Sequence, residues 1–136
     1  MRPEELVRAC WEYRLPIAQL IELLDDDREW SSASATSFDG DSTTRIHVVS
    51  QAALWALAAL DPTAAPIARV AATVLRLHGR TCEISFCTTA APHEVPLRWT
   101  DRELAPFGAP LIARLQEALR DEDPDVRRRA REVLDG

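Results

Sequence analysis

The segment Pro66-Ile67-Ala68-Arg69-Val70-Ala71 sets the pattern from which the fold can be predicted. Similar segments begin at Pro16 and at Pro110. Proline is tolerated in the first turn of a helix, because the N–H that it lacks would have no intrahelical partner there. Each segment therefore predicts the start of a helix, and starts that recur every 40–50 residues or so are typical of stacked helical pairs.

Apolar residues at helical spacing predict further helices along the chain. The expected helical ranges are 3–14, 46–60, 63–78, 109–120 and 124–134. The last of these opens with Asp123 as N-cap and Pro124 in the first turn. We therefore expect a mainly all-α fold over residues 1–136, a single domain of about six helices in antiparallel pairs.

Two segments interrupt the helical pattern. Residues 31–44 are small, polar and aperiodic, which predicts a flexible loop. Residues 81–88 alternate in polarity and are β-prone, and Val95-Pro96-Leu97-Arg98-Trp99 could pair with them. We expect a small β-hairpin inserted near residues 80–99, with Pro96 placing its second strand at an edge.

Residues 110–135 resemble a HEAT repeat, a family of paired helices. The markers are a first helix rich in Leu, then Asp121, then Asp-Pro-x-Val-Arg with Val126 and Arg127. Residues 20–25 and 49–57 resemble the family less closely, and the expected hairpin replaces the second helix of the unit that begins at Pro66. The resemblance implies a HEAT-like fold in which Asp121, Val126 and Arg127 are structural.

The composition limits the classes of partner. The chain has 136 residues with 22 acidic and 16 basic side chains, all the basic ones arginine, and a net charge of −6. A protein of this sign is not drawn to nucleic acid by its overall field, so we expect a protein partner, possibly a basic one. The absence of a long apolar run predicts no membrane span, and the odd count of three cysteines fits a cytoplasmic protein without structural disulfides.

One group of residues has the chemistry of a metal site. His78, Cys82, Cys87 and His93 are the ligand types that tetrahedral zinc prefers. In a straight strand, however, Cys82 and Cys87 point to opposite faces, so a bulge would be needed to bring them together. The alternatives are a zinc-stabilised module or a thiol enzyme that uses these four residues, or cysteines that are simply buried.

Other residues suggest a binding surface. Trp30 and Trp99 flank irregular segments, and tryptophan is favoured as an anchor at interfaces. The run Asp25-Asp26-Asp27 follows a helix and could face a basic partner. The arginine cluster at 127–131 could bind nucleic acid, or it could form a solvent-exposed face in which its charges pair with nearby acids.

We therefore expect a protein–protein interaction module, an adaptor or an inhibitor of the immunity type, that binds through an acidic, Trp-bearing helical surface. No catalytic residues and no cofactor are assigned. The alternatives from other classes are the zinc module or thiol enzyme and a nucleic-acid-binding HEAT-like protein that uses the arginine cluster.

Overall fold

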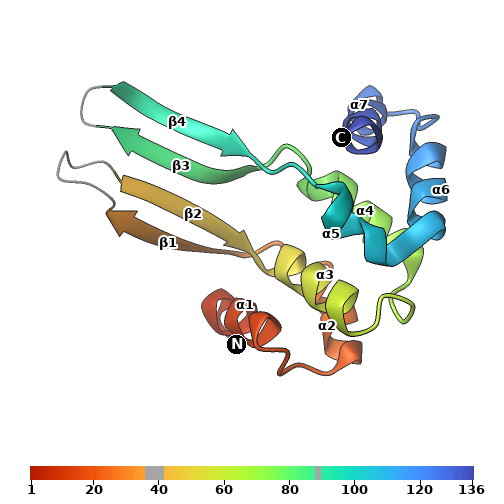
Figure 1. Cartoon of the computed structure of the whole chain (residues 1–136), viewed down its shortest axis with the longest axis horizontal. Helices are drawn as coiled ribbons and strands as arrows, with labels where there is room; N and C mark the ends of the chain where they lie inside the picture. Colours follow the sequence, from red (N-terminus) through yellow and green to blue (C-terminus); the bar gives the residue numbers. More distant parts are fainter. Residues whose placement is uncertain (36–41, 88–89) are drawn as a thin grey trace.

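The computed structural model describes residues 1–35, 42–87 and 90–136. The helices gather at one end of the molecule, and a four-stranded sheet projects from them (Figure 1). In chain order the elements are α1 (Pro3–Trp11), α2 (Ile17–Leu23), β1 (Glu29–Ala35), β2 (Ser42–Val48), α3 (Val49–Leu60), α4 (Ile67–Leu77), β3 (Thr81–Cys87), β4 (Ala90–Pro96), α5 (Asp101–Leu104), the 3-10 helix η1 (Ala105–Phe107), α6 (Gly108–Ala118) and α7 (Pro124–Asp135).

Each half of the chain contributes one hairpin to the sheet. The strand order is β1-β2-β3-β4 and every pair is antiparallel. The two hairpins join where β2 pairs with β3, with Thr43 opposite Ser85 and Arg45 opposite Glu83. In β3 the register shifts between Thr81 and Glu83, which leaves Cys82 as an extra residue in a bulge.

The hydrophobic core lies in the helical body, with α3 at its centre. Val49, Ala53, Leu54 and Leu57 of α3 are fully buried. The helices α1 and α2 pack against α3, while α4 packs against α3, α6 and α7. Because β2 runs directly into α3, the buried Val48 anchors the sheet in this core, and the outer parts of the strands leave it.

The expected mainly all-α, HEAT-like fold is wrong: the structure is mixed α/β with a four-stranded antiparallel sheet. The hairpin expected near residues 80–99 is present as β3 and β4, but its second strand is Ala90–Pro96 rather than 95–99, and it is half of a larger sheet. Its other half, β1 and β2, comes from the range 31–44 that was expected to be a loop, together with its flanks; residues 36–41 lie outside the described part of the chain.

Residues 110–135, which resemble a HEAT repeat, do form a pair of adjacent helices. The helices α6 and α7 pack against each other and are joined by a short turn. In that turn Asp121 accepts a hydrogen bond from the N–H of Asp123 at 2.9 Å, and Arg127 donates to the carbonyl oxygen of Asp121 at 2.6 Å. Val126 is half-buried. These contacts hold the turn and the start of α7 together.

In the described part of the chain, none of the helices combines the length and the apolar character required to cross a bilayer.

The central place of α3 predicts unequal effects of two leucine substitutions on the same helix. Leu54 is 0% exposed and Leu60 is 45% exposed. Leu54→Ala should lower the free energy of unfolding by about 2–5 kcal/mol, because it leaves a cavity in the core. Leu60→Ala should change it by less than about 1 kcal/mol. Urea unfolding followed by circular dichroism measures both, and equal losses would contradict the core described above.

Candidate functional site

The three aspartates expected to face a partner are instead paired within the chain. Asp25 pairs with Arg69 at 2.6 Å and Asp26 with Arg28 at 2.8 Å. Asp27 accepts hydrogen bonds from Arg76 at 2.6 Å and from Ser50 at 2.7 Å. Each of the three charges is therefore matched by an arginine of the same chain, although the Asp25 side chain stays largely exposed.

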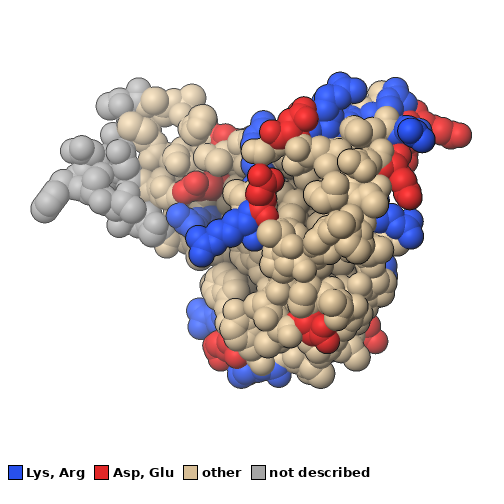
Figure 2. Space-filling model, turned by 45° about the vertical axis from the view of Figure 1, so that its right-hand side comes forward, with Lys and Arg blue, Asp and Glu red and all other residues tan. Residues whose placement is uncertain are grey.

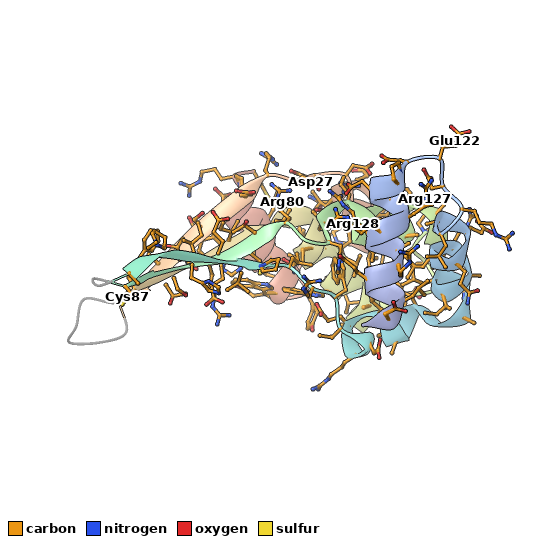
Figure 3. The ribbon with its side chains drawn as sticks, turned by 90° about the horizontal axis from the view of Figure 1, so that it is seen from above. Asp27, Arg80, Cys87, Glu122, Arg127 and Arg128 are labelled. Atoms are coloured by element: carbon orange, nitrogen blue, oxygen red, sulfur yellow. The ribbon has the colours of Figure 1, made fainter. Side chains whose placement is uncertain are left out.

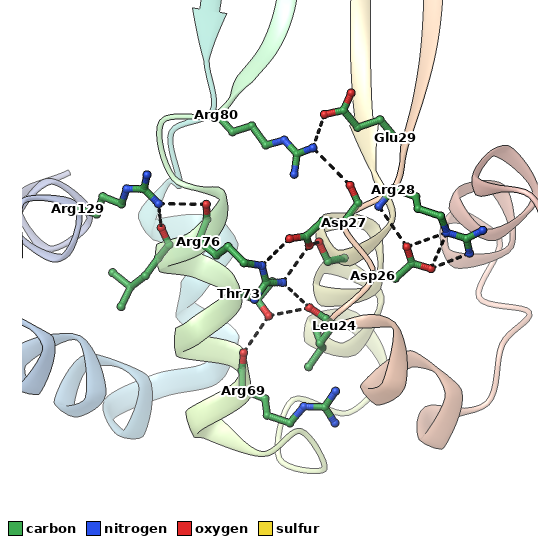
Figure 4. A network of polar contacts seen from close by, with 12 residues as sticks. Leu24, Asp26, Asp27, Arg28, Glu29, Arg69, Thr73, Arg76, Arg80 and Arg129 are labelled. Atoms are coloured by element: carbon green, nitrogen blue, oxygen red, sulfur yellow. Dashed lines mark hydrogen bonds and ion pairs between the residues drawn. The ribbon is translucent and has the colours of Figure 1, made fainter. Parts of the chain in front are cut away.

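Asp27 ties the segment between α2 and β1 to both α4 and β3, as Figure 4 shows. Arg76 on α4 reaches the Asp27 carboxylate and the carbonyl oxygen of Leu24. Arg80, just before β3, donates to the carbonyl oxygen of Asp27 and pairs with Glu29. Burial by itself raises the pKa of Asp27, but the hydrogen bonds from Arg76 and Ser50 and the charges of Arg76 and Arg80 outweigh it and hold the pKa below its ordinary value of 3.8.

The two tryptophans expected at a binding surface have different surroundings. Trp99 is only 4% exposed, and its indole N–H donates to the carbonyl oxygen of Val74 at 2.8 Å. It is a core residue and cannot contact a partner. Trp30 is half-buried and lies at the base of the sheet, where it belongs to a cluster of aromatic rings.

The expected metal ligands are spread over the molecule. His78 is the C-cap of α4 and its Nε2 lies 3.0 Å from Glu132, while Cys82 lies in the β3 bulge. Cys87 lies at the outer end of the sheet, far from α7 (Figure 3), and His93 is exposed on β4. Among the described residues, no group of three or more His, Cys, Asp or Glu side chains could hold a metal ion.

The arginine cluster at 127–131 is mostly paired. Arg127 donates to the carbonyl oxygens of the preceding turn, Arg128 pairs with Asp125, and Arg129 pairs with Asp125 and donates to the end of α4. Basic and acidic side chains lie next to one another over the upper part of the face in Figure 2. That mixture differs from the continuous basic surface that contacts with a phosphate backbone need.

The aromatic cluster at the base of the sheet comes from three elements. The ring centroids of Trp11 (α1) and Trp30 (β1) lie 5.7 Å apart, and that of His47 (β2) lies 5.0 Å from each. Arg8 lies over the Trp30 ring at 5.2 Å, and Ser32 contacts His47 Nε2 at 3.1 Å. Burial, together with the charge of Arg45, lowers the pKa of His47 and so favours the neutral imidazole. The cluster is a rigid, partly exposed apolar shelf beside β1.

The two outer strands of the sheet differ in chemistry. From Trp30 to Ala35, β1 contains neither a charged residue nor a proline, and Ser31 and Ala33 are exposed. The opposite outer strand, β4, contains Pro92, Glu94 and Pro96. Proline and charge are common devices that prevent an edge strand from pairing with another chain. β4 carries them along its length, whereas β1 has a single charged residue, Glu29, at its inner end.

A hollow of about 400 Å³ opens between α1, α3 and the paired strands β2 and β3. Its lining is partly aromatic and partly polar: Trp11, Arg45, Ile46, His47, Gln51, Trp55, Cys82 and Glu83. Sequence reasoning missed both this hollow and the aromatic shelf. Of the residues that form the shelf and the hollow, only Trp30 was expected at a binding surface. The others come together through the pairing of strands that are distant in the sequence.

Comparisons with known proteins gave no match for this chain, whether among protein-family models, curated proteins or solved structures.

The pairing of Asp27 predicts a pH-dependent loss of stability. Asp27→Asn should lower the free energy of unfolding by about 1–3 kcal/mol at neutral pH, because Arg76 loses its carboxylate. A carboxylate whose pKa is lowered by folding stabilises the protein above its ordinary pKa and ceases to do so as the pH falls through the lowered value. The difference between the wild type and Asp27→Asn should therefore shrink as the pH falls below 3.8.

Asp25→Asn is the matched control, because the Asp25 side chain is 72% exposed in its ion pair with Arg69. Exposed pairs contribute little, so its effect should stay below about 1 kcal/mol. Urea unfolding at a series of pH values measures both variants. A difference for Asp27→Asn that stays constant down to pH values well below the ordinary pKa would show that the charge of Asp27 does not stabilise the fold.

Proposed function

We propose that the protein is a protein–protein interaction module that binds an extended segment of a partner protein along the open edge of β1. The observation that carries this proposal is the contrast between the two outer strands. An edge strand presents a row of unpaired N–H and C=O groups, and a partner strand can add to it through main-chain hydrogen bonds. The uncharged run from Trp30 to Ala35 offers no obstacle to such pairing.

The position of the sheet favours this mode of binding. The strands extend beyond the helical body, and in Figure 1 the outer part of β1 has no helix beside it. The exposed Ser31 and Ala33 are small, so an added strand could approach closely. The edge is therefore accessible along much of the strand.

The aromatic shelf supplies a place for one side chain of the partner. Trp30 and Ser32 lie on the same face of the sheet, opposite His47 and Arg45. Trp11 covers the inner end of this face and is 43% exposed. Large aromatic residues contribute strongly to binding when a partner desolvates them. We expect the bound segment to be uncharged and to place an apolar or aromatic side chain against Trp11 and Trp30.

A second copy of the chain fits this edge less well. In an antiparallel pair of two β1 strands centred on Ser31, Trp30 would face Ser32. Serine cannot fill the apolar shelf, so the exposed part of the ring cluster would stay uncovered. A different protein with a larger side chain at that position makes better use of the surface.

The interaction need not involve the acidic run expected from the sequence. Asp25, Asp26 and Asp27 are occupied by arginines of the same chain. Whether the module acts as an adaptor or as an inhibitor of the immunity type, the proposed contact is the same. We place it in the cytoplasm, where the free thiols of Cys10 and Cys82 would stay reduced.

A charge placed on β1 should block binding. Ala33→Lys adds a lysine to the exposed part of β1, and Ala91→Lys adds the same charge to the exposed part of β4. Edge lysines oppose strand addition. In capture from a lysate of the source organism, a partner retained by the wild type and by Ala91→Lys should be lost with Ala33→Lys. Its affinity, measured with the purified partner, should fall at least tenfold, or about 1.4 kcal/mol.

Amide hydrogen exchange locates the contact. The purified partner should slow exchange within residues 30–35 and leave β4 unchanged, because only β1 would gain main-chain hydrogen bonds. Retention of the same partner by Ala33→Lys would contradict the proposal. So would light scattering that shows the wild type pairing with itself through β1, since the edge would then serve a second copy.

A further inference from the structure

We infer that the hollow between α1, α3 and the β2–β3 pair binds a small planar heteroaromatic molecule with hydrogen-bond donors and acceptors along one edge, of the nucleobase or nucleoside type. The inference goes beyond the proposed function: the hollow shares Trp11 and His47 with the aromatic shelf but lies inward from β1, over the two central strands. Its volume of about 400 Å³ falls in the range of small-molecule sites.

Aromatic rings from three elements line the hollow. Trp11 comes from α1, His47 from β2 and Trp55 from α3. The indole N–H of Trp55 donates to Glu103 at 2.8 Å, so this side chain is fixed and contributes its ring to the lining. Trp11 is held by its edge contact with His47, with ring centroids 5.0 Å apart. Rings held in this way are suited to stacking on a planar ligand, because little order is lost on binding.

Two charged side chains of the hollow are uncommitted within the described residues, whereas its histidine contacts a serine of β1 and its cysteine thiol donates to a carbonyl oxygen of β4. Arg45 and Glu83 lie directly opposite each other on β2 and β3. Neither side chain makes a hydrogen bond or an ion pair with any of residues 1–35, 42–87 and 90–136. By contrast, Arg76, Arg80 and Arg128 are each paired with a carboxylate. A cation and an anion are thus both available at the hollow.

Gln51 adds a side-chain amide to the lining of the hollow. It lies on α3, is only 8% exposed and lines the hollow. Within the described residues its side-chain amide has no hydrogen-bond partner. The amide is accessible from the hollow rather than sealed in the core, and a ligand there can supply it with both a donor and an acceptor.

The combination of these groups selects the ligand chemistry. Arg45 donates hydrogen bonds, Glu83 accepts them, and Gln51 does both. A planar ring with donors and acceptors side by side would satisfy all three while stacking on tryptophan, as the edge and faces of a nucleobase can. The charges of Arg45 and Glu83 cancel, and the chain carries a net charge of −6. An uncharged nucleoside therefore fits better than a phosphate-bearing strand.

Calorimetric titration with guanosine, adenosine and cytidine tests the inference. At least one nucleoside should bind in a one-to-one complex with a Kd below about 1 mM, and it should quench tryptophan fluorescence because Trp11 and Trp55 line the site. Glu83→Gln, which removes the anion but keeps the shape, should weaken that binding at least fivefold. Gln51→Leu should do the same by removing the amide.

Glu94→Gln is the matched control. Glu94 lies opposite Ile84 on β4, so it faces the other side of the sheet from Glu83. It should leave the affinity within twofold of the wild type, and thermal unfolding should show that Glu83→Gln is as folded as this control. Absence of binding for all three nucleosides, or an affinity unchanged by Glu83→Gln and Gln51→Leu, would overturn the inference. Tighter, strongly salt-dependent binding of a single-stranded oligonucleotide would also overturn it.

Discussion

The carboxylate of Asp27 connects the two halves of this molecule. It receives hydrogen bonds from Ser50, at the start of α3, and from Arg76 on α4, while its own carbonyl oxygen is contacted by Arg80 at the entrance to β3. Both hairpins therefore leave the helical body from one fixed region. This arrangement directs β2 and β3 along each other, and on their pairing depend the sheet, the edge of β1 and the hollow.

The longer helices and one hairpin could be predicted from the sequence, and the four-stranded sheet could not. Apolar spacing located α4, α6 and α7 to within a few residues. A helix that packs against a core has apolar residues at helical spacing on its buried face, and this pattern is visible in the sequence. The strand β1 has no comparable apolar pattern, and its serines and alanines are weak strand formers. The apolar residues Ile46 and Val48 of β2 precede α3 without a break, so they were assigned to the helix that follows.

The candidate sites depend on contacts that no local pattern contains. The charge of Asp27 predicted a surface role, yet its position beside Arg76 makes it structural. Trp99 carries the same side chain as Trp30 but is buried by α4. The hollow is assembled from α1, β2, α3 and β3, and the openness of β1 follows from strand order. Residue types indicated binding chemistry, while tertiary structure decided which residues supply it.

The β2–β3 pair also has a consequence for how the chain reaches this structure. Ser42 pairs with Phe86, and both α3 and α4 lie between these two residues in the sequence. Each hairpin closes a short loop, whereas this central contact closes a long one at a greater entropic cost. Folding rates fall as contacts become less local. We therefore expect the central contact to form late, leaving two separate hairpins with four exposed edges in the intermediate, which makes newly synthesised chains most prone to aggregation at that stage.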